Sequence, residues 1–333
     1  MQSKPRVAIT MGDPAGIGSE IIVKAYAELA ELADITVIGD AAVMERATKI
    51  CNSSLTIHHV TDITDEVVAD GINVLDLGLV DDVDFGELKE EYGAASLAYV
   101  ERAIELAQQH KIDAIVTAPI NKQATRMAGS EYAGHTGMLA DFTDTENYAM
   151  LLIEDGLRVS HISTHVPLEV AVDHVTTANV LDTIEVTHEA LRGLGIDKPV
   201  IAVAGINPHA SDGGLLGERD ETEIRPAVEQ ATEQGINATG PESPDTVFKH
   251  AAQGTYDAVV AMYHDQGHIP VKMLGATTDS PVSGVNMTVG LPIIRTSVDH
   301  GTAFDIAGKG IASEESLIQA VEMAVRVATE KGE

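Results

Sequence analysis

Three histidines lie in polar clusters that each follow an apolar, strand-like run: His165 in STHVPL, His209 in INPHASDGG and His264 in YHDQGH. In α/β proteins, ligands bind at the carboxyl ends of the strands. Three imidazoles, in a chain whose only cysteine is Cys51, suit a catalytic divalent metal with an open coordination position. Any one of them alone is more often structural. We therefore predict that all three hold one metal ion, which could be Zn²⁺, Co²⁺, Mn²⁺ or Mg²⁺.

The stretch AMYHDQGHIP (261–270) ends a predicted buried strand with a group of polar side chains. Asp265 is placed to orient a metal-bound imidazole from behind. Gly267 is expected to let the chain turn away after the metal ligand. The role of His268 stays open.

Basic residues are scarce in this chain, so their positions are informative. Lys122, Lys272 and Arg295 lie beside glycine-rich or strand-end segments, away from predicted helix surfaces. Arginine can clamp a carboxylate or phosphate through two hydrogen bonds, and lysine supplies a point charge. These residues are candidates for binding an anionic substrate, with plain surface solubility as the alternative.

The segment MGDPAGIGSE (11–20) matches neither the dinucleotide nor the P-loop fingerprint. It is either a simple strand-to-helix turn or one wall of an active cleft, with helix N–H groups directed at an anion.

Strand-like and helix-like runs alternate along the chain, which indicates an α/β fold with a mostly parallel sheet covered by helices on both faces. Asp155-Gly156 predicts a hairpin within 147–164. The predicted helices are 18–32, 41–50, 94–110, 177–195, 221–235 and 313–332.

The composition limits the possible partners. The formal net charge is −31, which disfavours binding to nucleic acid or anionic membranes. The apolar runs are strand-sized and no signal peptide is evident, so we expect a cytoplasmic protein. Many acidic residues with few lysines suggest a salt-rich cytoplasm, where salt screens the self-repulsion.

Five stretches together show a resemblance to a known family: MGDPAGIGSEI, TAPINK, GHTGMLA, YHDQGHIPVK and VNMTVGLPIIRTSVDHGTAFDIAGKG. They resemble the 4-hydroxythreonine-4-phosphate dehydrogenase (PdxA) family from about residue 6 to about residue 330. The last stretch is also similar to the cofactor loop of the isocitrate and isopropylmalate dehydrogenase superfamily.

The resemblance implies roles for particular residues. The metal ligands would be His165, His209 and His264. The substrate-binding residues would be His135, Thr136, Lys272, Asn286 and Arg295. The cofactor NAD would be held by His300, Gly301, Asp305, Ile306, Ala307 and Gly308. The proton donor is open among Lys272, His135 and Asp265.

The resemblance also implies two α/β lobes of the isocitrate/isopropylmalate dehydrogenase type around a cleft. Residues 1–125 and 286–333 would form the cofactor lobe, and residues 126–285 the lobe for metal, substrate and dimer contacts. The family is dimeric, so a homodimer whose sites are shared between chains is expected.

The implied reaction is NAD-dependent oxidation of a phosphorylated 3-hydroxy acid, followed by decarboxylation. YHDQGHIPVKMLG followed by ATTDSPVSGVNMT resembles the branch that converts D-threonate or D-erythronate 4-phosphate to dihydroxyacetone phosphate. The alternative substrate is 4-phosphohydroxy-L-threonine, the precursor in pyridoxal phosphate synthesis. Two other classes stay open: a phosphate-handling acyltransferase and a non-catalytic sensor of phosphorylated acids.

Overall fold

The computed structural model describes residues 4–63, 68, 70–132, 134–275 and 284–331. Its contacts divide the chain into two compact units. Unit 1 comprises Met1–Asp144 and Pro292–Glu333, and unit 2 comprises Thr145–Leu291.

The division between the units lies elsewhere than the predicted boundaries at 125/126 and 285/286. Helix α5 (His135–Phe142) belongs to unit 1, where it contacts α3 (Glu90–Gln108). Strand β11 (Val285–Val289) belongs to unit 2, because it pairs along its whole length with β6 (Ala149–Glu154). A boundary at 285/286 would cut this strand in two.

Unit 1 has a parallel sheet in the order β3-β4-β2-β1-β5-β12. Its strands are Arg6–Thr10 (β1), Asp34–Gly39 (β2), Thr56–Val60 (β3), Gly71–Asp76 (β4), Ala114–Thr117 (β5) and Ile294–Val298 (β12). Besides α3 and α5, its helices are Gly18–Leu32 (α1), Ala41–Ile50 (α2), Lys122–Met127 (α4) and Glu315–Lys331 (α11).

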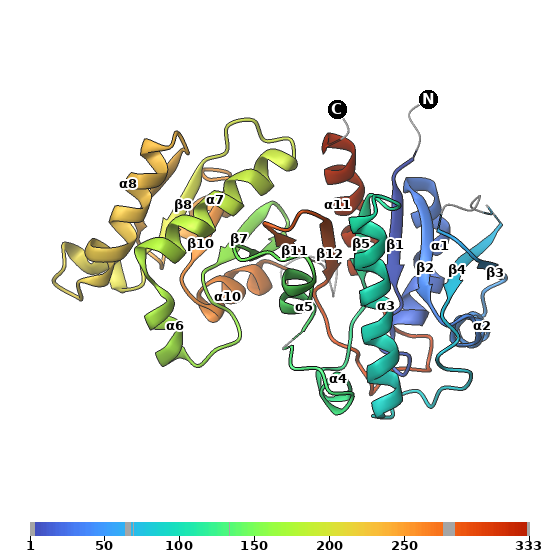
Figure 1. Ribbon diagram of the computed structural model, residues 1–333. Coiled ribbons are helices and arrows are strands. Elements are labelled where there is room, and N and C mark those ends of the chain that lie inside the picture. The colour runs from blue at the N-terminus through green and yellow to red at the C-terminus, as the bar shows by residue number, and fades with distance from the viewer. Residues whose placement is uncertain (1–3, 64–67, 69, 133, 276–283, 332–333) are drawn as a thin grey trace. The chain divides into compact units, whose positions relative to one another are not determined.

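The helices of unit 1 cover both faces of its sheet. Helix α3 packs against β1, β2 and β5, and α1 contacts both α2 and α11 on the opposite face (Figure 1). This arrangement follows from right-handed crossovers, because the chain moves one way from β1 to β2 and the other way from β4 to β5. Strands β1, β2 and β5 are buried on both faces, which explains their largely apolar sequences.

Unit 2 has the strand order β11-β6-β7-β10-β8-β9. The remaining strands are Leu157–His161 (β7), Ile201–Ala204 (β8), Ala238–Glu242 (β9) and Ala258–Ala261 (β10). Its helical elements are Leu168–His174 (α6), Thr177–Gly193 (α7), Pro208–Asp212 (η1), Asp220–Ile224 (η2), Arg225–Glu233 (α8), Val247–Ala252 (α9) and His264–Gly275 (α10).

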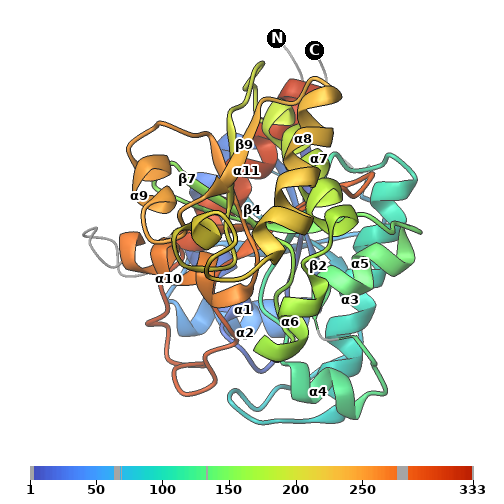
Figure 2. The same cartoon turned by 90° about the vertical axis from the view of Figure 1, so that its left-hand side faces the viewer.

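The sheet of unit 2 is mixed. Strands β7, β10, β8 and β9 are parallel, and β6 pairs antiparallel with both β11 and β7. The predicted hairpin is confirmed: Asp155 and Gly156 join β6 to β7, both with positive φ angles. Figure 2 shows α9 and α10 on one side of these strands and α7 and α8 on the other.

The prediction for Gly267 is wrong. The chain does not turn away after His264, because residues 264–275 form helix α10 and Gly267 lies within it. A Cβ atom at Gly267 would come within 2.3 Å of Nε2 of His161 and 2.8 Å of Val159. The glycine therefore lets α10 pack closely against β7.

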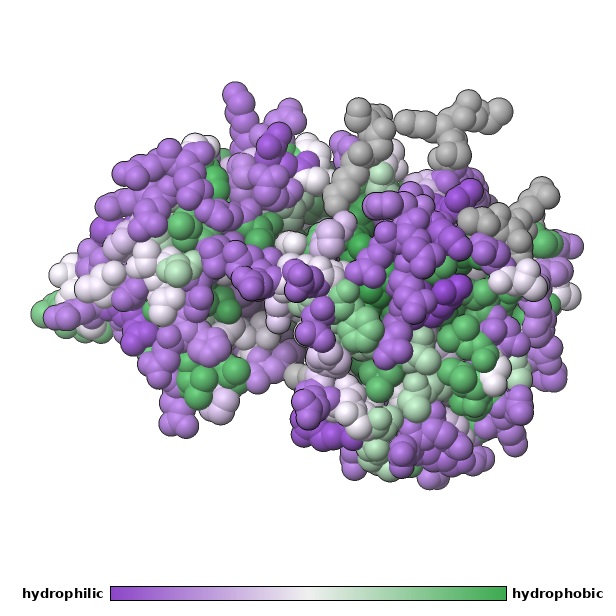
Figure 3. Space-filling view, in the orientation of Figure 1, coloured by the Kyte–Doolittle hydropathy of each residue, from purple (hydrophilic) through white to green (hydrophobic). Residues whose placement is uncertain are grey.

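Hydrophilic residues cover much of the face seen in Figure 3, as the 52 acidic and 21 basic residues lead one to expect. No helix in the described part of the chain is long and apolar enough to cross a membrane.

Candidate active site

A cluster of four imidazoles lies in unit 2, where the ends of β7 and β10 meet the start of α10. The rings of His165 and His264 have centroids 5.7 Å apart. His264 stacks on His268 at 3.7 Å, and His268 lies 4.7 Å from His161. Two of the three predicted metal ligands, His165 and His264, are thus brought together.

A hydrogen bond to Asp265 orients the imidazole of His264, and a second one links His264 to His268. Its Nδ1 lies 2.7 Å from Oδ1 of Asp265, and its backbone carbonyl lies 3.0 Å from Nδ1 of His268. When Nδ1–H donates to a carboxylate, the Nε2 lone pair is left available for a metal. Lys272 lies on the same helix, eight residues after His264.

His161 forms the buried end of the cluster. Burial, and to a smaller extent the nearby His268, lower the pKa of His161 to about 3. Its Nε2 has no hydrogen-bond partner among the described residues. This imidazole is therefore neutral at physiological pH.

The described residues of one chain do not gather a complete metal site. The described residues contain no group of three or more His, Cys, Asp or Glu that could hold a metal. The pair His165 and His264 has the donor chemistry of a metal site, with the carboxylate of Asp265 behind one imidazole. Two of the three predicted metal ligands, His165 and His264, therefore suit a divalent metal in their chemistry and position.

His209 lies on a loop with unusual backbone geometry. His209, Ala210, Ser211 and Asp212 all have positive φ angles, between 46° and 66°, and Gly213 follows at 69°. A left-handed conformation costs roughly 1–2 kcal/mol for each residue that has a Cβ atom. Such strain persists only where the surroundings impose it, and it is concentrated at functional sites.

A second group of predicted site residues lies in unit 1. Arg295 on β12 is only 3% exposed, and its Nη2 donates to Oγ1 of Thr117 on β5 at 2.6 Å. Burial lowers the pKa of Arg295 to about 9, so the guanidinium stays charged at neutral pH. His135, at the start of α5, lies close enough to Arg295 and Lys122 for their positive charges to lower its pKa.

The electrostatics of His135 differ from those of an ordinary surface histidine. Burial lowers the pKa of His135 well below its usual range, and the positive charges of Arg295 and Lys122 lower it further. Its Nε2 is buried and has no partner among the described residues. In the free protein His135 is therefore neutral, and the positive charge of this group comes from Arg295 and Lys122.

The other predicted substrate residues are divided between the units. Thr136 follows His135 on α5 of unit 1. Lys272 on α10 and Asn286 on β11 belong to unit 2, where Nδ2 of Asn286 lies 3.1 Å from Sδ of Met150. Residues 276–283 of the segment that resembles the sugar-acid branch lie outside the described residues.

The predicted cofactor residues form one loop of unit 1, and the MGDPAGIGSE segment packs directly against it. The backbone N–H of Ile17 donates to the carbonyl of Thr302 at 3.1 Å. The carboxylate of Glu20, which is fully buried on α1, accepts hydrogen bonds from the backbone N–H groups of Gly308 and Gly310. The segment is thus more than a turn, because it anchors the glycine-rich loop.

The sequence interpretation gave Glu20 no role. The sequence signal for such a role is a charged residue inside the apolar face of a predicted helix. An ionised carboxylate is seldom buried without partners, so its position there indicates that it binds other groups of the protein.

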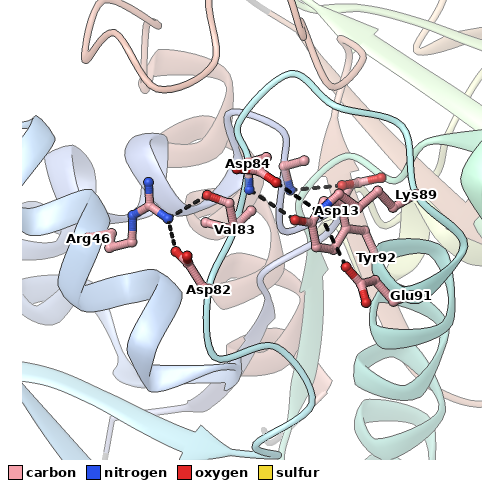
Figure 4. A network of polar contacts seen from close by, with 9 residues as sticks. Asp13, Arg46, Asp82, Val83, Asp84, Lys89, Glu91 and Tyr92 are labelled. Carbon is pink, nitrogen blue, oxygen red and sulfur yellow. Dashed lines mark hydrogen bonds and ion pairs between the residues drawn. The ribbon is translucent and has the colours of Figure 1, made fainter.

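Asp13 is a second buried carboxyl group in this segment (Figure 4). It is 1% exposed, and its Oδ1 accepts a hydrogen bond from the backbone N–H of Ala15 at 2.9 Å. Its Oδ2 is buried without a hydrogen-bond partner among the described residues. Burial raises the pKa of Asp13 from 3.8 to about 6, against the lowering effect of the backbone amides of Ala15 and Asn121.

The raised pKa of Asp13 predicts a pH-dependent stability difference for Asp13→Asn. Between pH 3.8 and 6 the unfolded carboxyl ionises while the folded one stays protonated, so the native protein loses stability as the pH rises. The full loss above pH 6 is about 3 kcal/mol at 1.36 kcal/mol per pKa unit. We expect Asp13→Asn to be more stable than the native chain at pH 7.5, by at most that amount.

Urea unfolding at pH 7.5, 6.0 and 4.0 tests this prediction. The difference between Asp13→Asn and the native chain should shrink towards zero at pH 4.0. Asp81→Asn is the control, because Asp81 is exposed in the same unit. An Asp13→Asn difference that is constant with pH would refute the role of ionisation.

Comparison with known proteins gives the family of this chain. Residues 31–324 match the family model of the pyridoxal phosphate biosynthetic protein PdxA. A D-threonate 4-phosphate dehydrogenase from Cupriavidus necator is 46% identical over 98% of both chains. A D-threonate 4-phosphate dehydrogenase from Salmonella typhimurium is 45% identical, covering 97% of this chain and 98% of the relative.

Solved structures agree with the sequence comparison. A 4-hydroxythreonine-4-phosphate dehydrogenase from Klebsiella pneumoniae matches with a TM-score of 0.88 and 41% identity, over 98% of this chain and 99% of the other. A phosphotransacetylase from Staphylococcus aureus matches with a TM-score of 0.53 at 12% identity, over 99% of this chain and 94% of the other, so it shares the fold alone. The predicted α/β fold of the isocitrate/isopropylmalate dehydrogenase type is confirmed. This chain belongs to the PdxA family of NAD-type dehydrogenases.

Proposed function

We propose that the protein catalyses the NAD-dependent, divalent-metal-dependent oxidative decarboxylation of D-threonate 4-phosphate or D-erythronate 4-phosphate to dihydroxyacetone phosphate. The observation that carries this proposal is the match to two D-threonate 4-phosphate dehydrogenases, which are 45% and 46% identical to this chain over nearly its full length. The cationic group of unit 1 supports it independently, because it suits a substrate with a phosphate and a carboxylate.

The substrate would be bound by two cationic side chains and by a neutral histidine. Arg295 is held by Thr117 and directs a planar fork of donors at an anion, while Lys122 adds a flexible positive charge. Neutral His135 would accept or donate a hydrogen bond through its unpartnered Nε2. Thr136, Lys272 and Asn286 are the further proposed substrate contacts.

The reaction balances in two steps. The C3 alcohol gives a hydride to the nicotinamide and a proton to a base, and a ketone forms at C3. The bond between C1 and C2 then breaks, carbon dioxide leaves, and C2 takes up a proton. NAD is the hydride acceptor, so the protein has to supply orientation and proton transfer.

Lys272 is the proton donor that we favour among the three candidates. His135 is neutral in the free protein because its pKa is lowered, so it is a much weaker acid than an imidazolium. Asp265 is engaged with His264. Lys272 lies on α10, eight residues after His264, which is a proposed metal ligand.

A divalent metal, when bound, would lower the pKa of the C3 alcohol and stabilise negative charge on the oxygen during decarboxylation. His165, His209 and His264 are the proposed ligands. His264 would bind through Nε2, because Nδ1 is engaged with Asp265.

A homodimer would complete the site, since two proposed ligands lie close together in one chain and the third would come from a second copy. The segments that bear or flank these histidines also expose large apolar side chains, which suits a protein contact. These side chains are Val166, Leu168, Val170, Leu215, Leu216, Ile269 and Met273.

NAD is proposed to bind to the loop formed by His300, Gly301, Asp305, Ile306, Ala307 and Gly308. The loop is preorganised by Glu20, whose carboxylate accepts hydrogen bonds from the backbone N–H groups of Gly308 in the loop and of Gly310 just after it. A loop that is already ordered loses less conformational entropy when a ligand binds.

The test is NADH formation with Mg²⁺ or Zn²⁺ at high salt, comparing three substrates. We expect kcat/KM for D-threonate or D-erythronate 4-phosphate to exceed that for 4-phosphohydroxy-L-threonine by at least about tenfold, because a site made for the C2 hydroxyl leaves polar groups unpaired with an amine. The reverse order would support the pyridoxal phosphate precursor, in line with the name of the Klebsiella pneumoniae structure.

A metal-loaded protein that forms no NADH with any of the three substrates would refute the dehydrogenase proposal and favour a sensor of phosphorylated acids. Acyl transfer from an acyl phosphate to coenzyme A, measured in parallel, would favour the acyltransferase class.

A further inference from the structure

We infer that Asp220 is a positioning residue that holds the His209 loop, residues 206–212, in its left-handed conformation and thereby presents His209 to the metal. This inference rests on the proposed function for the role of His209. The conformation of the loop and its contacts are properties of the chain itself.

Asp220 is fully buried, at 0% exposure, and its carboxylate faces the loop. Oδ1 accepts a hydrogen bond from the backbone N–H of Ile206 at 2.8 Å, and Oδ2 accepts one from the N–H of Asn207 at 3.3 Å. Oδ2 also accepts hydrogen bonds from Nδ2 of Asn207 at 2.7 Å and from Oγ of Ser211. One carboxylate therefore collects four donors, all from the two ends of the strained turn.

The neighbouring backbone is shaped to admit this carboxylate. A Cβ atom at Gly205 would lie 2.6 Å from Oδ1 of Asp220 and 2.9 Å from Cα of Ala210. Only glycine permits the end of β8, the carboxylate and the turn to approach so closely. The N–H of Ala210 donates to the carbonyl of Asn207 at 3.1 Å, which closes the turn.

The four consecutive positive φ angles at non-glycine residues explain why such an anchor is needed. Without the carboxylate, His209 and its three successors would relax towards ordinary backbone conformations. The fraction of chains with His209 correctly presented would fall, and the apparent metal affinity would fall by the same factor. A change in Asp220 should thus act on metal binding through the population of the loop conformation, without any contact to the metal.

Asp220→Asn is the main test, because asparagine keeps the shape but replaces one acceptor oxygen with an NH₂ group that faces donors. In the metal-free protein we expect faster amide hydrogen exchange across residues 206–212. In a Co²⁺ titration followed by visible absorption we expect a dissociation constant 10–100-fold higher. Excess metal should restore most of the activity, which a merely structural defect would not allow.

Three further variants make the result interpretable. Ser211→Ala removes one hydrogen bond and should cause a smaller change in the same direction, which keeps the test usable if Asp220→Asn fails to fold. Glu218→Gln changes an exposed carboxylate two residues away and should behave as the native chain. His209→Ala shows whether His209 binds the metal at all.

The outcomes separate this inference from the proposed function. If His209→Ala weakens Co²⁺ binding but Asp220→Asn and Ser211→Ala do not, the positioning role is overturned while the metal site stands. If the native chain binds no Co²⁺, the proposed metal fails, and amide exchange alone decides whether Asp220 holds the loop. Unchanged exchange at residues 206–212 in Asp220→Asn would overturn the inference in either case.

Discussion

Replacing His264 with alanine is expected to lower kcat/KM by about 10³-fold, because a metal acting as a Lewis acid contributes several kcal/mol to the transition state. The loss should be accompanied by weaker metal binding, measured by Co²⁺ titration. Folding should be little affected, since the side chain of His264 is more than a third exposed. His250→Ala is the matched control, because His250 is an exposed histidine on α9 of the same unit.

Mixing two inactive variants tests whether the site is shared between chains. If His209 comes from one chain and His264 from the other, a dimer of one His209→Ala chain and one His264→Ala chain contains one native site. Random exchange of subunits would then restore about a quarter of the native activity. No recovery after proven subunit exchange would show that the three histidines do not combine in this way.

Replacing Arg295 with methionine is expected to lower kcat/KM by roughly 10²–10³-fold, mainly through a higher KM. The physical reason is the loss of charge-assisted hydrogen bonds to the substrate from a buried cation, which is worth about 2–5 kcal/mol. Steady-state kinetics with the preferred phosphorylated acid measure the effect. Arg295→Lys should recover only part of it, because lysine lacks the planar fork of donors.

Stability distinguishes this result from simple unfolding. Burial lowers the pKa of Arg295, which means that the folded protein holds this cation at an energetic cost. A buried cation replaced by an apolar side chain of similar length should leave the free energy of unfolding unchanged or higher. Arg126→Met, at an exposed site on α4, is the control. A native KM in Arg295→Met would contradict the proposed role of this arginine.

Much of the fold was predictable because local physical rules dominate it. Apolar runs of strand length alternate with amphipathic runs of helix length, and Asp155-Gly156 adopts the positive φ angles that a two-residue hairpin needs. The boundary between the units was less predictable. Strand β11 belongs with β6 because of hydrogen bonds between segments more than a hundred residues apart, which no local pattern encodes.

Gly267 shows why a turn is predicted after His264 where the structure has a helix. Glycine after a cluster of polar residues normally marks a turn. Here the close packing of α10 on His161 outweighs the low helix propensity of glycine, and the segment stays helical. As a result the imidazoles of His264 and His268, one turn apart on the same helix, stack on each other.

The fold class, the family and the residue types available for chemistry depend on periodicity and on long motifs, so they can be inferred along the chain. Tertiary packing settles which of those residues meet. It paired His165 with His264, made His135 neutral beside Arg295 and Lys122, and gave the buried carboxylates of Glu20 and Asp220 their loop-holding contacts. Burial and proximity between distant segments set these properties, and both arise only when the chain has folded.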